Sequence, residues 1–187
     1  MKKIIIVFLF LFNFQSWTKA DDIRDFQIEG ISVGDSLTDH FNESEIKRSK
    51  DEMQYDSNKF YQVTILSDNF DQYDAMHFQL KNNDNKFIIH SMSGIIELEI
   101  KKCLKKQKKI FKELLTLFDN PKTYDEGRRK HPGIYNAYSY DNYIYVKSDF
   151  ISVSCYEFIN SNFAEKLLIS VDTAEFNNFL NTEAHQN

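Results

Sequence analysis

The chain has 187 residues and carries 28 acidic against 23 basic side chains, for a formal net charge of −5. This acidic excess argues against a general nucleic-acid-binding protein, which is usually basic. Its length and its apolar content of 42% suit one domain with a real hydrophobic core, and we expect that domain to cover residues 21–187.

The first twenty residues have the layout of a cleaved export signal. Lys2 and Lys3 form a positive start, an unbroken apolar run covers 4–12, and Ala20 ends a cleavage site of small residues. This apolar run is too short to cross a bilayer as a helix. We therefore predict a signal peptide at 1–20, a secreted or periplasmic protein, and no integral membrane segment after cleavage.

Two short helices are expected near the start of the mature chain, after a short entry strand over 22–29. Asp35 or Ser36 can cap the first helix, and Asn42 can cap the second, which we expect over 43–50. From residue 59 onward, β-branched and aromatic residues alternate with polar ones, a pattern typical of strands. Three antiparallel strands are therefore predicted, at 60–66, 73–81 and 86–92.

The strongest helical pattern covers Glu99–Phe118. Its apolar residues recur every three or four positions and form one stripe that includes Cys103. Seven lysines lie mostly off that stripe: Lys101, Lys102, Lys105, Lys106, Lys108, Lys109 and Lys112. Asn120-Pro121 ends the helix, because proline disfavours helical geometry in the residue before it. A charged loop is expected over 121–133.

A second block of strands follows this helix. Its β-branched and aromatic residues predict four strands, at 134–140, 142–147, 150–158 and 165–172. Thr173 caps a last short helix, and the chain ends in a polar tail, 181–187. Blocks of helices and strands with hairpin-length loops indicate an α+β fold, in which an antiparallel sheet packs against the long amphipathic helix. The same order also allows two helix-then-strands units.

Two cysteines are present, Cys103 on the apolar stripe of the long helix and Cys155 in a predicted strand. Because exported proteins meet an oxidising environment in which cysteines tend to pair, we predict a disulfide between them. Two buried free thiols are the alternative. Two thiolates without a histidine at ligand spacing cannot complete a zinc site, so we expect no metal and no cofactor.

The motif Gly34-Asp35-Ser36-Leu37 resembles the nucleophile block of the GDSL/SGNH hydrolases. This resemblance implies a serine esterase in which Ser36 attacks an ester. The family also needs a Gly-x-Asn-Asp-like block and an Asp-x-x-His pair near the C-terminus. Asp74 and His77 have the second spacing, but they fall within a predicted strand and far from the C-terminus. We therefore interpret Ser36 as part of a helix start and keep the esterase as the alternative.

The longer stretch Glu29–Phe41 resembles the opening of small secreted proteins of marine, AT-rich bacteria that carry no assigned function. It is also similar to the helix start of outer-membrane assembly lipoproteins of the SmpA/OmlA kind. The order of elements is similar to the helix-then-strands units of β-lactamase-inhibitor-like domains. The lipoproteins carry a lipid-bearing cysteine that has no counterpart after this signal, so their anchoring does not carry over.

The lysines of the long helix are the best candidate for a binding feature, because they concentrate positive charge on an acidic protein. They form either a solvated helix face or a site for anionic lipid headgroups or cell-wall polymer. Arg128, Arg129 and Lys130 form a second basic cluster. The five histidines show no metal-ligand spacing. The sequence thus predicts a secreted or periplasmic, non-enzymatic interaction module, with an unknown protein or a cell-envelope polyanion as its partner.

Overall fold

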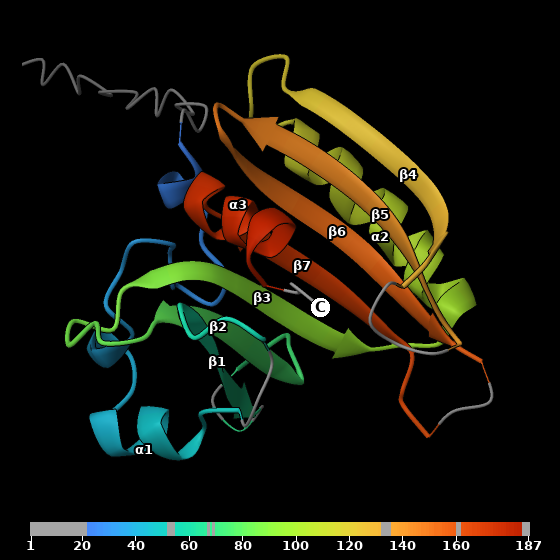
Figure 1. Cartoon of the computed structure of the whole chain (residues 1–187). Helices are drawn as coiled ribbons and strands as arrows, with labels where there is room; N and C mark the ends of the chain where they lie inside the picture. The colour runs from blue at the N-terminus through green and yellow to red at the C-terminus, as the bar shows by residue number, and fades with distance from the viewer. Residues whose placement is uncertain are drawn as a thin grey trace, which may run out of the picture.

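One antiparallel sheet of seven strands forms the centre of the molecule, in the order β1-β2-β3-β7-β6-β5-β4 (Figure 1). The structure is a computed structural model and describes residues 22–51, 55–66, 68, 70–131, 136–159 and 162–184. The predicted signal peptide, 1–20, lies outside these residues. Among the described residues, no helix is long and apolar enough to span a membrane.

The strands alternate with short loops and follow two meanders. They are β1 Phe60–Leu66, β2 Ala75–Lys81, β3 Ile89–Glu97, β4 Lys122–Lys130, β5 Ala137–Val146, β6 Asp149–Phe158 and β7 Lys166–Asp172. The α-helices are α1 Glu43–Arg48, α2 Ile100–Leu115 and α3 Ala174–Thr182, and short 3-10 helices cover Ile23–Asp25 and Leu37–Asp39. After β3, α2 carries the chain to the far edge of the sheet, and β4 to β7 return until β7 pairs with β3.

The predicted fold class is wrong, because a single large sheet dominates the architecture and not a sheet packed against one long helix. Within the described residues the three α-helices are short, with 6, 16 and 9 residues. In the described part of the chain, the two blocks of strands also do not form separate helix-then-strands units. The pairing of β3 with β7 joins both blocks of strands edge to edge, so that they share one continuous hydrogen-bonded sheet.

The largest single error concerns 121–133, which was expected to be a charged loop. Nine of these residues form the edge strand β4, which pairs along its length with β5. All but one of its side chains are exposed. Charged side chains are common on edge strands because they discourage pairing with another chain. Because β4 is charged on both faces, it lacks the alternation of apolar and polar residues by which strands are predicted from sequence.

Other boundaries also differ from those expected. Residues 22–29 begin with a 3-10 helix, because the Asp22 side chain accepts a hydrogen bond from the Arg24 backbone amide. The two strands expected around Asp141 are one continuous strand, β5, of 10 residues. The Asn42 and Thr173 caps are confirmed, since each side chain accepts a bond from a backbone amide in the first turn of its helix.

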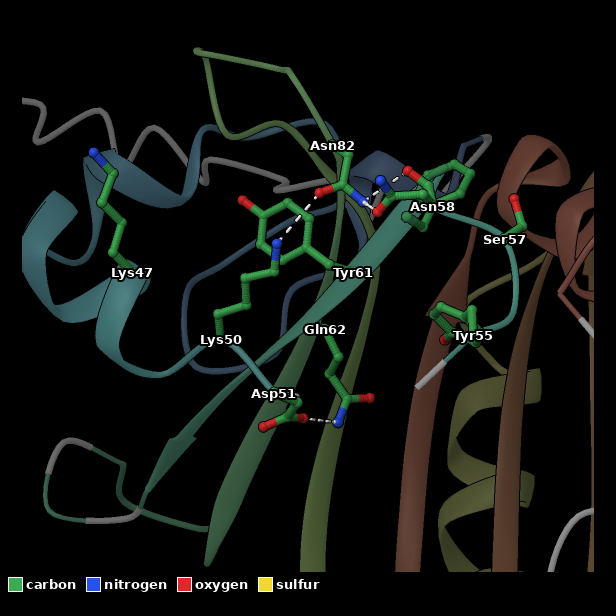
Figure 2. Close-up of a pocket in the computed structure, with 10 residues that line it drawn as sticks. Lys47, Lys50, Asp51, Tyr55, Ser57, Asn58, Tyr61, Gln62 and Asn82 are labelled. Carbon is green, nitrogen blue, oxygen red and sulfur yellow. Dashed lines mark hydrogen bonds between the residues drawn. The ribbon is translucent and has the colours of Figure 1, made fainter. Parts of the chain in front are cut away.

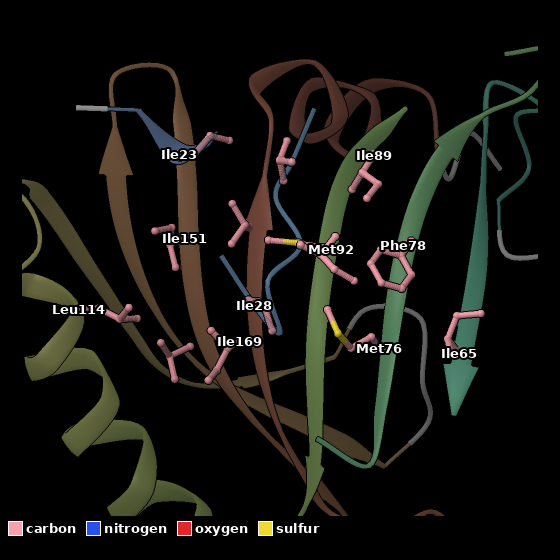
Figure 3. Packing of buried hydrophobic residues seen from close by; sticks show 14 of the residues in the cluster. Ile23, Ile28, Ile65, Met76, Phe78, Ile89, Met92, Leu114, Ile151 and Ile169 are labelled. Carbon is pink, nitrogen blue, oxygen red and sulfur yellow. The ribbon is translucent and has the colours of Figure 1, made fainter. Parts of the chain in front are cut away.

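The apolar face of the sheet carries the main core (Figure 3). Side chains from β1, β2, β3, β5, β6 and β7 meet there and are almost fully buried, among them Val63, Phe78, Met92, Ile144, Ile151 and Val171. Segments from the start of the chain cover part of this face through Ile23 and Ile28, and α2 covers another part through Leu114. Burial of each such side chain stabilises the folded state by about 1.5–3 kcal/mol relative to leaving it exposed.

The opposite face, here called the polar face, is built differently. Helix α3 lies on this side, and Phe176 and Phe179 pack with Phe60 of β1 in a small second cluster. Away from that cluster the face is mainly polar. One row crosses all seven strands, because each member is the register partner of the next: Tyr124, Tyr143, Ser152, Ser170, Ser93, His77 and Thr64.

Candidate functional site

The lysine face of α2 consists of Lys101, Lys102, Lys105, Lys106, Lys108, Lys109 and Lys112, and all seven are exposed. The buried residues of the helix, Cys103, Gln107 and Leu114, lie on its opposite side. Across Glu99–Leu115 these seven lysines meet only two acidic residues, Glu99 and Glu113, which pair with Lys102 and Lys109. The helix therefore presents a strong excess of positive charge away from the sheet.

A disulfide and a buried amide fix this helix to the sheet. The predicted Cys103–Cys155 disulfide is confirmed and links α2 to β6, with 5.9 Å between the two Cα atoms. One turn further on, the Gln107 amide donates hydrogen bonds to the backbone oxygens of Tyr140 and Val153, at 2.6 and 2.7 Å. The lysine face is thus carried by a helix whose orientation is held at two successive turns.

Sequence reasoning missed Gln107. A polar residue on the apolar stripe of a helix indicates a buried hydrogen bond to another element, since a buried amide needs hydrogen-bond partners. The stripe 103, 107, 110, 114 has Gln at its second position. That signal could have predicted a polar anchor, but not its two partners, which come from strands distant in the sequence.

The second basic cluster lies on β4 and is largely paired. Arg128 bonds Glu157 at 3.0 Å, and Arg129 bonds Glu126 at 2.9 Å. The Arg128 guanidinium also lies 3.4 Å from the centre of the Tyr138 ring. These two carboxylates offset the charge of both arginines within the molecule, so the cluster offers less excess charge to an anionic partner than the α2 lysines do.

Ser36 is held by its neighbours in a loop. Its hydroxyl lies 2.7 Å from the Lys86 backbone oxygen and 2.6 Å from the Thr38 hydroxyl. With the Ser36 proton donated to a carbonyl oxygen, the hydroxyl is not aligned for transfer of that proton to a histidine base. Asp74 and His77, the pair with the hydrolase spacing, belong to the entrance and the middle of β2. Ser36 also forms no side-chain cap on the helix that follows it.

Buried polar groups of the polar face have perturbed acid–base behaviour. Burial raises the pKa of Asp172 to about 7, although the Ser91 hydroxyl donates a hydrogen bond to this carboxyl group. Burial and the nearby Lys166 lower the pKa of His77 to about 4. Both side chains are therefore favoured in their neutral forms. Next to them, the Gln79 side-chain oxygen is buried without a partner among the described residues.

Sequence reasoning also missed the polar face. Its signal is a period of two within the strands, as in Ser139, Asp141 and Tyr143 of β5 or Ser152 and Ser154 of β6. Successive side chains of a strand point to opposite faces, so such alternation places the polar residues together. Register and strand order, which bring these residues into rows, could not be read from the sequence.

A pocket of about 570 Å³ opens where β1 begins, beside the polar face (Figure 2). It is lined by Lys47, Lys50, Asp51, Tyr55, Ser57, Asn58, Phe60, Tyr61, Gln62 and Asn82. Lysines, amides and one carboxylate dominate this lining. Among the described residues, no group of three His, Cys, Asp or Glu side chains is placed to hold a metal ion.

Comparison with known proteins finds no protein-family model, no curated protein and no solved structure that matches the chain. The resemblances of Glu29–Phe41 to other secreted proteins therefore stay predictions.

Proposed function

We propose that this protein is an exported, non-enzymatic interaction module that binds a phosphate-bearing polyanion of the cell envelope through the lysine face of α2. The observation that carries the proposal is the exposure of seven lysines on one side of a helix that is fixed to the sheet on the other. Exposed lysines attract polyanions through summed, salt-sensitive charge interactions and need no shaped pocket.

The fixed orientation of the helix supports this proposal. A surface whose lysines are presented from a rigid element loses less conformational freedom on binding than a mobile segment would. The Cys103–Cys155 disulfide and the Gln107 hydrogen bonds supply that rigidity. A disulfide also fits an oxidising compartment, as does the predicted signal peptide at 1–20.

Replacement of Lys105, Lys106 and Lys109 by Gln tests the proposal. Loss of three exposed charges should weaken retention on phosphatidylglycerol vesicles or on soluble polyphosphate by about tenfold at low salt, because each exposed ion pair contributes only about 0.2–1 kcal/mol. A matched variant replaces Lys86, Lys122 and Lys147, which are exposed elsewhere and change the net charge equally. Equal weakening by both variants would mean that net charge alone governs binding.

Retention on only one of the two probes would identify the source of the phosphate, lipid headgroup or polymer. Retention on neither would contradict the proposal. Export is tested separately by N-terminal sequencing of the secreted protein, which should begin at Asp21. An intact Met1 in the exported protein would contradict the signal-peptide prediction.

A further inference from the structure

The pocket at the start of β1 combines groups that a purely electrostatic surface does not need. It is small, at about 570 Å³, which is in the range of small-molecule sites. Its lining brings two cations, one carboxylate, three side-chain amides and aromatic rings to one place. We propose that it binds an acidic sugar, that is, a hydroxylated ring that carries one negative charge.

The cationic part of the pocket is mainly Lys50, which follows α1, because the Lys47 ammonium group in the last turn of α1 is already paired with Glu43 at 2.6 Å. Lys50 is held in position, because its ammonium group lies 4.2 Å from the centre of the Tyr61 ring and 3.3 Å from the Asn82 side-chain oxygen. Figure 2 shows Lys50 reaching past the Tyr61 ring toward Asn82. A positioned ammonium group with a further proton to donate can bind a carboxylate of the ligand.

The polar part of the pocket is Asp51 and Gln62. The Gln62 amide and the Thr64 hydroxyl both donate to Oδ2 of Asp51, and Gln79 in turn donates to the Gln62 side-chain oxygen at 2.7 Å. This network fixes the Asp51 carboxylate and leaves its Oδ1 to accept a hydrogen bond from a ligand hydroxyl. A ligand made only of negative charge would be repelled here, whereas a hydroxylated ring would gain a charge-assisted hydrogen bond.

Donors complete the set on the other side of the pocket. The Asn82 amide donates to the backbone and side-chain oxygens of Asn58, at 2.8 and 3.1 Å, which orients the Asn58 side-chain nitrogen as a donor. The Ser57 hydroxyl can donate or accept. Sugar hydroxyls both donate and accept, so they need such a mixed lining. Among the lining residues that the structure describes, Asp51 is the one carboxylate, which does not suit a metal ion.

Saturation-transfer NMR of the full mature chain tests this inference with D-glucuronate, D-glucose and acetate. We expect glucuronate to bind about tenfold more tightly than either of the others, because each comparison compound lacks one of the two sets of contacts. Lys50→Met should abolish the preference of the pocket for glucuronate over glucose. Asp51→Asn should weaken both sugars, and Ser57→Ala provides a milder variant of the same test if Asp51→Asn unfolds the protein.

Replacement of Lys105, Lys106 and Lys109 by Gln must leave glucuronate binding unchanged, so this test fails or succeeds independently of the proposed function of the lysine face. In two-dimensional NMR spectra, glucuronate should change the amide chemical shifts of Tyr61, Gln62 and Asn82. Three results would each overturn the inference. They are acetate binding as tight as that of glucuronate, equal binding of glucose and glucuronate, and no saturation transfer from the protein to any of the three compounds.

Discussion

Replacing Gln107 by Glu tests how α2 is held on the sheet. The two side chains have the same shape, but an ionised carboxylate has no proton for the backbone oxygens of Tyr140 and Val153. Gln107 is only 2% exposed, so the new charge would be buried. The two lost neutral hydrogen bonds cost about 1 kcal/mol each. Together with the uncompensated buried charge, the total loss of stability is about 3–5 kcal/mol.

The loss of stability should depend on pH. Burial raises the pKa of a carboxyl group in the folded state above its unfolded value of about 4.3. The destabilisation of Gln107→Glu therefore grows as the pH rises above that value. At pH 4 the protonated acid can still donate one hydrogen bond, and the loss should fall to about 1 kcal/mol.

Urea unfolding of the oxidised protein at pH 4 and pH 7.5 measures both quantities. Asn85→Asp provides the control, because it makes the same chemical change at an exposed turn residue. We expect the control to lose less than about 0.5 kcal/mol at either pH. A loss for Gln107→Glu that is small, or that is equal at the two pH values, would refute the role assigned to this amide.

Three further predictions follow from buried groups. Asp172 has a raised pKa of about 7 in the folded state, so its contribution to stability should be largest below pH 4 and decline as the pH rises to 7; Asp172→Asn should remove this decline in pH-dependent urea unfolding, and an unchanged profile would count against it. Reduction of Cys103–Cys155, which closes a loop of 52 residues in sequence, should lower stability by about 4 kcal/mol, and an unchanged melting temperature after reduction would be inconsistent with that. Gly94→Ala should destabilise by about 1–3 kcal/mol, since the new Cβ would lie 2.4 Å from the Tyr73 ring, and additivity with Tyr73→Ala in a double-mutant cycle would disprove that clash.

The strands that alternate apolar and polar residues could be predicted from the sequence. β1 was expected at 60–66 and lies there, and β6 and β7 each begin within one residue of their expected start. In these segments one face is buried in the core, so the period of two is strong. The hairpin-length loops also predicted that the strands would be antiparallel.

The balance between sheet and helix could not be predicted in the same way. β4 has almost no buried side chain, so its strand conformation depends on hydrogen bonds to β5 and not on an apolar pattern of its own. The pairing of β3 with β7 joins residues about 80 positions apart, such as Ser91 and Asp172. Local sequence carries little information about which strand edges will meet.

The candidate sites show the same division. The α2 lysines and the two cysteines belong to one helical pattern and one strand, so local periodicity placed them correctly. The pocket at β1 instead needs α1, the loop at 55–58 and Asn82 to come together, and only the folded chain brings them to one place. Lys50 and Asp51 lay beyond what spacing in the sequence could single out.

The salt dependence of binding to phosphatidylglycerol vesicles tests the central claim most directly. Affinity should fall steeply with salt for the wild-type protein and for the control with Lys86, Lys122 and Lys147 replaced, because exposed charges are screened over about 10 Å at 0.1 M. For the variant with Lys105, Lys106 and Lys109 replaced by Gln, the same plot should be clearly shallower. The same steep dependence in all three proteins would contradict the assignment of the lysine face of α2 as the binding surface.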